Sequence, residues 1–284
     1  MPHQPLIDSA DLRARLQSDT PPIVLDCSNE LSDADAGLAQ YEAGHIPGAR
    51  HVSLQHTLSG KRTGLNGRNP LPDASVFCSA MGAMGIAHDT QVVAYDDAGG
   101  LYAARLWWLL QWIGHAAVAV LDGGLASWHA AGQAVTQETP PPSAATLHLR
   151  APLVQTVAYE DLRSNLDQPR WLVLDARGAD RFRGENETLE ARAGHMPGAR
   201  NRPFRENLDA NGRFKSAAQL RREFHALTGG RPGDAIVSQC GSGVSACHNI
   251  LAMEIAGLHG VALYPGSWSE WSARADTPIA VLDD

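Results

Sequence analysis

The clearest structural signal in the sequence is the stretch Ile236-Val-Ser-Gln-Cys240-Gly-Ser-Gly-Val-Ser-Ala246-Cys-His-Asn-Ile-Leu-Ala-Met253. A short apolar run ends at Cys240, small residues follow, and a helix-forming segment begins at about Ala246, which is typical of a strand, a tight loop and a helix. Gly241 and Gly243 allow the loop to curl so that its N–H groups point inward, and the helix adds the positive end of its dipole. Both effects stabilise a thiolate, so the pattern predicts that Cys240 is a nucleophile.

Length and composition restrict the class of protein. The chain has 284 residues, 44% of them hydrophobic, which predicts about two globular domains. The formal net charge of −8 argues against a nucleic acid partner, because phosphates require a basic surface. The apolar stretch at about residues 101–120 is interrupted by Arg105, Gln111 and His115, so no membrane span is expected. The N-terminus lacks the pattern of a signal peptide, and a cytoplasmic protein is the expectation.

The cysteines suggest one reactive thiol and three packed ones. Cys27, Cys78, Cys240 and Cys247 show no Cys-x-x-Cys spacing, so neither a disulfide framework nor a zinc site is expected. Cys247 lies about 10 Å from Cys240 along a helix, beyond disulfide reach.

The sequence contains one unit twice. Ile23-Val-Leu-Asp26 recurs as Leu172-Val-Leu-Asp175, and Ala43-Gly-His-Ile-Pro-Gly-Ala-Arg50 recurs as Ala193-Gly-His-Met-Pro-Gly-Ala-Arg200. The copies are about 150 residues apart, which indicates a duplicated domain and not a short-period solenoid. A further matching pair of segments places Asp96 opposite Cys240, so only the second copy is expected to carry the nucleophile.

Each copy alternates short β-branched runs with helical segments, which predicts an α/β fold with a central parallel sheet and helices on both faces. We expect the first domain over residues 1–137 and the second over 155–284. Residues 138–154, which include Pro140-Pro-Pro142, are expected to form an extended linker. The site is expected at the carboxyl ends of the strands.

Several motifs together resemble those of tandem-domain rhodanese-type sulfurtransferases. They are the Cys240 loop, the two Gly-His-x-Pro-Gly-Ala blocks, Leu121-Asp-Gly-Gly124 and Gly266-Ser-Trp-Ser-Glu-Trp271. The resemblance runs from about Leu6 to the C-terminus and implies two rhodanese-like domains, of which only the second keeps the catalytic cysteine. It implies that Cys240 takes a sulfur atom as a persulfide and passes it to cyanide, a thiol or a thioredoxin-like acceptor. It implies no metal or organic cofactor.

The loop distinguishes two branches of this family. Thiosulfate-using members resemble Cys-Arg-Lys-Gly-Val-Thr, whereas the neutral Gly241 and Ser242 resemble the loops of 3-mercaptopyruvate sulfurtransferases. The absence of two cations weakens the binding of a dianion more than that of a monocarboxylate. The sequence therefore favours 3-mercaptopyruvate as the small anionic donor, with thiosulfate as the alternative. If thiosulfate is preferred, a further cation must reach the loop, and Arg202 and Arg205 are the first candidates.

The resemblance also implies a set of donor-binding residues. Arg181 matches the substrate arginine of the family, and the loop contributes Gly241, Ser242, Gly243, Val244 and Ser245. For a second arginine of the mercaptopyruvate branch the nearest candidate is Arg192. The histidine of a possible relay is replaced by Asn69, so no triad around Ser242 is expected.

Two other classes of protein share parts of this pattern. Phosphatases and arsenate reductases use Cys-x₅-Arg, but Ala246 stands at the arginine position and removes the oxyanion clamp. The other class is a non-enzymatic persulfide carrier or binding module, which steady-state turnover with a small acceptor would distinguish from an enzyme.

Overall fold

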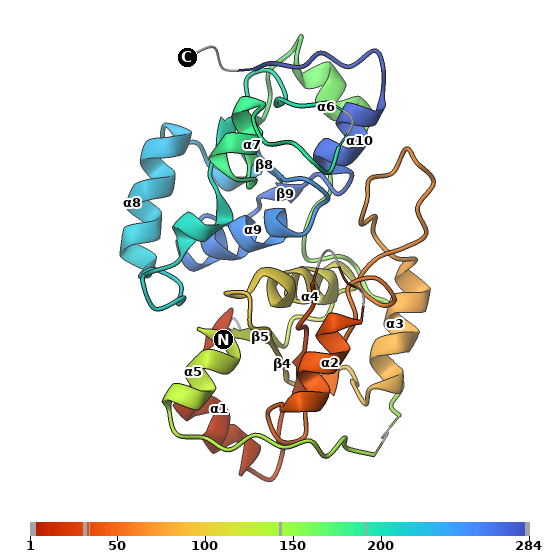
Figure 1. Cartoon of the computed structure of the whole chain (residues 1–284), viewed down its shortest axis with the longest axis vertical. Helices are drawn as coiled ribbons and strands as arrows, with labels where there is room; N and C mark the ends of the chain where they lie inside the picture. Colours follow the sequence, from red (N-terminus) through yellow and green to blue (C-terminus); the bar gives the residue numbers. More distant parts are fainter. Residues whose placement is uncertain (1–3, 31–32, 34, 142–143, 191, 282–284) are drawn as a thin grey trace. The chain divides into compact units, whose positions relative to one another are not determined.

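The computed structural model describes residues 4–30, 33, 35–141, 144–190 and 192–281 (Figure 1). The chain divides into two compact units. The first unit comprises Met1–Gly60, Leu71–Leu153 and Ala210–Arg213, and the second comprises Lys61–Pro70, Val154–Asp209 and Phe214–Asp284. Within the described residues, no helix combines the length and the apolar character needed to cross a membrane.

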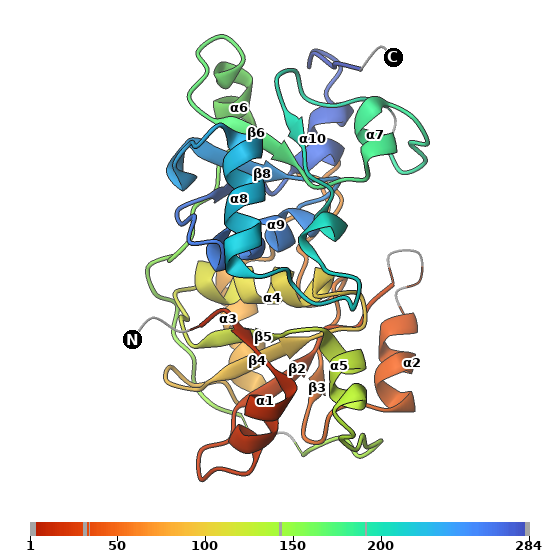
Figure 2. The ribbon, with the colours of Figure 1, turned by 90° about the vertical axis from the view of Figure 1, so that its left-hand side faces the viewer.

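The first unit is built on a parallel sheet with strand order β1-β5-β4-β2-β3. Its strands are β1 (Leu6–Ile7), β2 (Ile23–Asp26), β3 (Arg50–His51), β4 (Val92–Tyr95) and β5 (Val118–Leu121). Its helices are α1 (Ser9–Leu16), α2 (Ala36–Ala43), α3 (Ala74–Ala83), α4 (Leu101–Trp112) and α5 (Gly124–Ala130). Figure 2 shows α1, α2 and α5 on one side of this sheet and α4 on the other. Leu12 of α1, Tyr41 of α2 and Trp128 of α5 pack against Val24 and Val93 of the sheet in one buried cluster.

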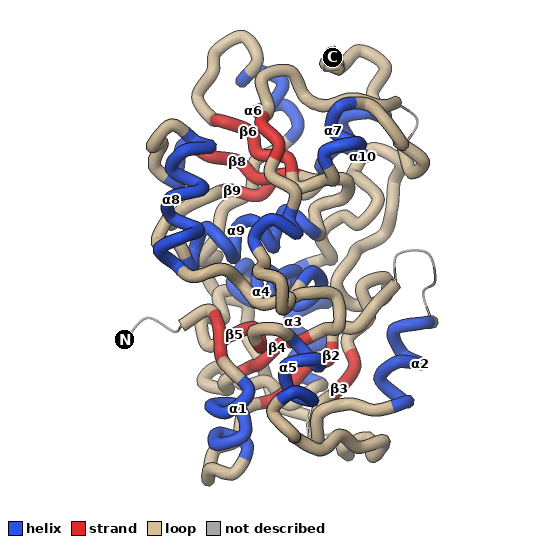
Figure 3. The backbone as a smooth tube through the Cα atoms, turned by 60° about the vertical axis from the view of Figure 1, so that its left-hand side comes forward, coloured by secondary structure: helices blue, strands red, loops and turns tan. Residues whose placement is uncertain are grey.

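The second unit repeats this arrangement with strand order β7-β6-β8-β9. Its strands are β6 (Leu172–Asp175), β7 (Arg200–Asn201), β8 (Ile236–Gln239) and β9 (Ala262–Leu263). Its helices are α6 (Tyr159–Asn165), α7 (Ala179–Arg183), α8 (Ala217–Thr228), α9 (Ser245–Ile255) and α10 (Ser267–Ala273), with short 3₁₀ turns η1 (Phe204–Asn207) and η2 (Gly233–Ala235). Figure 3 shows its strands in red between helices on both sides. The predicted fold class is confirmed.

Burial on both faces explains the apolar strands of the second sheet. Val173 and Val237 pack with Trp268 and other residues of α6 and α10. The next side chain along β8 points to the opposite face, because the hydroxyl of Ser238 donates to the carbonyl of Ala246 in α9 at 3.1 Å. The strand that leads to Cys240 is therefore held from both sides.

Local signals set the bounds of α8. The Ser216 side chain accepts a hydrogen bond from the Gln219 N–H at the N-terminus, and Gly229 ends the helix at φ 65 in the left-handed region. Leu220, Phe224 and Thr228 recur at a spacing of four residues and are buried, which makes one face of the helix part of the core.

The predicted domain boundaries stay a prediction, and the structure adds two facts to them. Part of the expected linker packs on the first unit, since the Ala145 N–H donates to the Gly82 carbonyl at 2.8 Å. The segment Lys61–Pro70, which belongs to the first copy in sequence, is part of the second unit. This segment brings Arg68 and Asn69 to the unit that contains Cys240.

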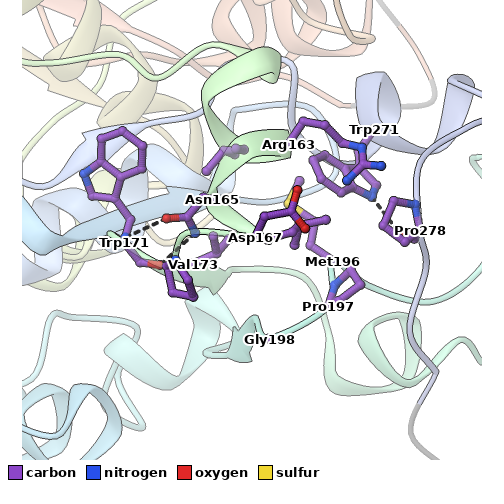
Figure 4. A pocket seen from close by; sticks show the side chains of 13 residues that line it. Arg163, Asn165, Asp167, Trp171, Val173, Met196, Pro197, Gly198, Trp271 and Pro278 are labelled. Carbon is purple, nitrogen blue, oxygen red and sulfur yellow. Dashed lines mark hydrogen bonds between the residues drawn. The ribbon is translucent and has the colours of Figure 1, made fainter.

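A pocket of about 470 Å³ lies beside α6 and α10 (Figure 4). Its walls include Leu162, Leu166, Trp171, Met196 and Trp271. Trp171 directly precedes β6 and Met196 precedes β7, so the pocket lies at the amino ends of these strands. Because Cys240 follows the carboxyl end of β8, this pocket is not part of the site described next.

Candidate active site

Cys240 lies directly after β8 in a loop that leads to α9. Its side chain is almost fully buried, and the Gly243 N–H donates to its Sγ at 3.1 Å. The segment that opens α10 fixes the backbone of the cysteine. The Cys240 N–H donates to the hydroxyl of Ser267 at 3.1 Å, and the Trp268 N–H donates to the Cys240 carbonyl at 2.9 Å. The sulfur is therefore held at a defined position beside a backbone donor.

The loop glycines have different roles. Gly243 has φ +80, and a Cβ on it would lie 2.6 Å from the Pro265 carbonyl oxygen, so only glycine fits. Gly241 does not have a positive φ, and a Cβ on it would lie 3.4 Å from Nη2 of Arg68 and 3.7 Å from both terminal nitrogens of Arg181. Its bare backbone therefore faces two guanidinium groups. Of the other predicted loop residues, Ser242 and Val244 are buried and Ser245 begins α9.

The corresponding loop of the first unit shows what this backbone arrangement binds. The Asp96 carboxylate accepts four backbone hydrogen bonds at 2.8 to 2.9 Å, from Ala98, Gly100, Tyr102 and Ala103. The two loops have equal length, because α4 and α9 each begin five residues after Asp96 and Cys240 respectively. In the first unit the N–H groups thus surround a fixed carboxyl group of the protein itself, and they oppose the burial that raises its pKa.

We expect Asp96→Asn to lower the free energy of unfolding by about 1–3 kcal/mol, because the amide nitrogen cannot accept from the donors that it would face. Urea unfolding followed by circular dichroism measures the change. Asp97→Asn is the matched control, since Asp97 is exposed. Equal stability of the two variants would contradict the role assigned to the Asp96 carboxylate.

Arg181 extends from α7 and lies beside the loop. Its Nε and Nη2 donate to the two carboxylate oxygens of Glu187 at 3.1 and 2.7 Å. The Glu187 side chain is 2% exposed, and Arg177 also reaches it at 3.4 Å. The predicted substrate arginine is thus close to Gly241 but is already paired bidentately, and its role in donor binding stays a prediction.

Arg68 is a residue of this site that no sequence motif had indicated. Its Nη2 faces Gly241 and lies 3.3 Å from Oε1 of Glu190, while its backbone N–H donates to the Ser269 hydroxyl at 2.9 Å. Burial raises the pKa of the Glu190 carboxyl, and the positive charge of Arg68 opposes this. No local motif connects Arg68 to a loop so distant in sequence. The only signal nearby is its neighbour Asn69, which stands at the position of the relay histidine of the family.

Asn69 contacts the loop directly. Its Nδ2 donates to the Ser242 hydroxyl at 2.8 Å, and both side chains are buried. A neutral amide does not take up a proton at ordinary pH, so it orients the serine without acting as a base.

The other arginines considered in the sequence have different partners. Arg192 donates to carbonyl oxygens at the end of α10, among them Ser272 at 2.7 Å, and so ties down the C-terminal segment. Arg202 is bound to Glu223 at 2.6 Å, and Arg205 lies over the Phe204 ring. Arg202 and Arg205 were named only for the case that thiosulfate is preferred, and that condition stays a prediction; the additional cation found beside Gly241 is Arg68.

Two repeated parallel-sheet units with a cysteine loop in the second define the class of tandem sulfurtransferases. The model of the rhodanese-like domain matches residues 8–131 and 158–274, and the chain belongs to this family.

A probable 3-mercaptopyruvate sulfurtransferase of Pseudomonas aeruginosa is 43% identical over 98% of both chains. The thiosulfate sulfurtransferase of Bos taurus is 35% identical over 89% of this chain and 85% of its own. Among solved structures, the 3-mercaptopyruvate sulfurtransferase of Leishmania major has a TM-score of 0.82 at 29% identity, covering 96% of this chain and 75% of that one. The chain is accordingly an enzyme that transfers sulfur.

Proposed function

We propose that the chain is a 3-mercaptopyruvate sulfurtransferase in which Cys240 is the nucleophile. The observation that carries this proposal is the position of Cys240, whose sulfur receives a backbone N–H and whose next residue faces the guanidinium groups of Arg68 and Arg181. The thiol sulfur of the donor would lie at Cys240, with its carboxylate toward Arg181. Full-length similarity to a probable 3-mercaptopyruvate sulfurtransferase supports the same choice of donor.

The proposed reaction has two displacements at sulfur. The Cys240 thiolate attacks the thiol sulfur of 3-mercaptopyruvate, a Cys–S–S bond forms and the carbon–sulfur bond breaks. The electron pair leaves with carbon as the enolate of pyruvate, which takes up a proton. A nucleophilic acceptor then attacks the outer sulfur of the persulfide and releases the thiolate. The loop N–H groups stabilise negative charge on sulfur in both steps, since the matching loop of the first unit holds the Asp96 carboxylate in this way.

Cyanide, a low-mass thiol and a thioredoxin-like protein all fit the second displacement as acceptors, because each offers a strong nucleophile. The four cysteines are buried and free, which agrees with a reducing compartment such as the cytoplasm.

The charges beside the loop favour a monocarboxylate donor. Arg68 is paired with Glu190 and Arg181 with Glu187, so neither guanidinium adds an uncompensated charge. We expect kcat/KM for 3-mercaptopyruvate to exceed that for thiosulfate at least about tenfold, which requires a difference of only about 1.4 kcal/mol. Initial rates with each donor and cyanide as acceptor measure this ratio. A preference for thiosulfate would overturn the choice of donor while leaving the sulfur-transfer class intact.

Thiosulfate remains the second candidate donor because of one observation, the presence of two guanidinium groups beside Gly241. A dianion would benefit from both of them if a bound donor displaced the glutamates.

A further inference from the structure

We propose that Arg68 is a donor-specificity residue of this enzyme, which with Arg181 forms a two-guanidinium site for the anionic group of the donor. The inference rests on the proposed function of Cys240 and adds to it a residue from the first of the two sequence copies. Three features of the second unit support it: the fixed position of the segment that carries Arg68, the direction of its guanidinium, and the weakness of its ion pair.

The segment Lys61–Pro70 is attached to the Cys240 loop and to α10 at three successive residues. Gly67 has φ +84, and a Cβ on it would lie 2.7 Å from the carbonyl oxygen of Gly266, so the two backbones are in close contact. The Arg68 N–H donates to Ser269, and the next side chain, Asn69, donates to Ser242 at 2.8 Å. The backbone of Arg68 is therefore fixed relative to the loop.

The guanidinium of Arg68 points to the open backbone of Gly241. Its Nη2 is 3.4 Å from the position of a Gly241 Cβ, slightly closer than the terminal nitrogens of Arg181 at 3.7 Å. The two groups thus reach the same spot, directly after Cys240 in the chain. Two sets of N–H donors that reach one place suit a carboxylate or another small oxyanion.

The two arginines differ in how firmly their own glutamates hold them. Glu187 binds Arg181 through two nitrogens, at 3.1 and 2.7 Å. Glu190 lies 3.3 Å from Arg68, but its Oε1 accepts no hydrogen bond from the part of the chain that the structure describes. Within the same part of the chain the buried Nε of Arg68 has no acceptor either. Arg68 is therefore the guanidinium that its own glutamate holds less firmly, so it can turn more readily to a substrate anion.

Charge makes this residue important for donor choice. Thiosulfate brings two negative charges to the loop and 3-mercaptopyruvate brings one carboxylate, so the loss of a cation weakens thiosulfate more. Removal of the negative charge of Glu190 acts in the opposite direction, because Arg68 is then uncompensated. Arg177, Arg181 and Glu187 are the other charged groups close to Glu190, and they are unchanged in both variants.

The test compares kcat/KM for both donors in Arg68→Gln and Glu190→Gln. We expect Arg68→Gln to lower the value for thiosulfate by about tenfold and that for 3-mercaptopyruvate by less, and Glu190→Gln to raise the value for thiosulfate. Arg68→Lys should restore part of kcat/KM for thiosulfate, since lysine returns the positive charge but not the planar guanidinium that binds an anion through two nitrogens. Arg62→Gln is the matched control, because Arg62 is exposed and lies in the same segment.

Equal effects of Arg68→Gln on the two donors, or changes in the same direction in both variants, would overturn the inference. Glu190→Gln keeps the test decisive if Arg68→Gln does not fold, since a thiosulfate value that does not rise in it contradicts the proposal. Persulfide formation on Cys240 is measured in parallel by peptide mass. Its absence in the unaltered protein would overturn the proposed function, whereas its presence with unaltered donor ratios would overturn only the role of Arg68.

Discussion

Cys240→Ser is expected to reduce sulfur transfer by at least about 10³-fold, because a serine hydroxyl is a weak nucleophile and cannot form a persulfide. The fold should remain, since the buried hydroxyl can still accept the Gly243 N–H that now bonds to Sγ. Steady-state rates with 3-mercaptopyruvate and cyanide measure the loss, and circular dichroism checks the fold.

Mapping of the added sulfur gives an independent result. After treatment with donor and removal of the excess, peptide mass should show the persulfide on Cys240 alone. Burial raises the pKa of the Cys27 and Cys78 thiols, which disfavours their reactive form. Cys247→Ser is the matched control, because Cys247 lies on α9, the helix that follows the Cys240 loop, and its sulfur donates to the Gly243 carbonyl at 3.3 Å, a bond that serine can replace. Persulfide found mainly on another cysteine would refute the assignment.

Arg181→Lys is expected to lower kcat/KM for the donor by about tenfold or more, although the charge is kept. The Glu187 carboxylate, which is 2% exposed, would exchange a bidentate partner for a single ammonium. Both terminal nitrogens that face Gly241 would also be lost, so the donor would have one guanidinium less. The same assay with both donors measures the effect.

Arg183→Lys provides the comparison for this experiment. Arg183 is on the same helix, but its ion pair with Glu185 is exposed at both partners and is expected to contribute little. Its activity should stay within about twofold of the unaltered enzyme. If Arg181→Lys behaved in the same way, Arg181 would be a structural partner of Glu187 and not a donor-binding residue.

Local patterns were sufficient to predict the duplicated α/β fold. Runs of three apolar residues and an aspartate, Ile23–Asp26 and Leu172–Asp175, became inner strands of two parallel sheets. The same register recurs in both, with Leu25 opposite Ala94 and Leu174 opposite Ser238. These features follow from periodicity and burial within a few residues, which a sequence displays directly.

Arg192 is a residue whose role could not be predicted from its position in the sequence. Its place before the Gly-His block suggested a substrate arginine, but the guanidinium fits carbonyl oxygens at the end of α10, including Ser272. A guanidinium binds carbonyl oxygens as well as carboxylates, so the residue type alone does not distinguish the two roles.

The sequence alone determined the strand, loop and helix around Cys240, because apolar runs and glycines act on their immediate neighbours. It also determined that the matching loop of the first unit begins with a carboxylate, Asp96, in place of a thiol. Only the tertiary structure decided which charged groups surround the loop. Arg68 reaches Gly241 because its segment belongs to the second unit, and there it also lies 3.3 Å from Glu190. Contacts between segments so distant in the chain depend on packing, and no local pattern encodes them.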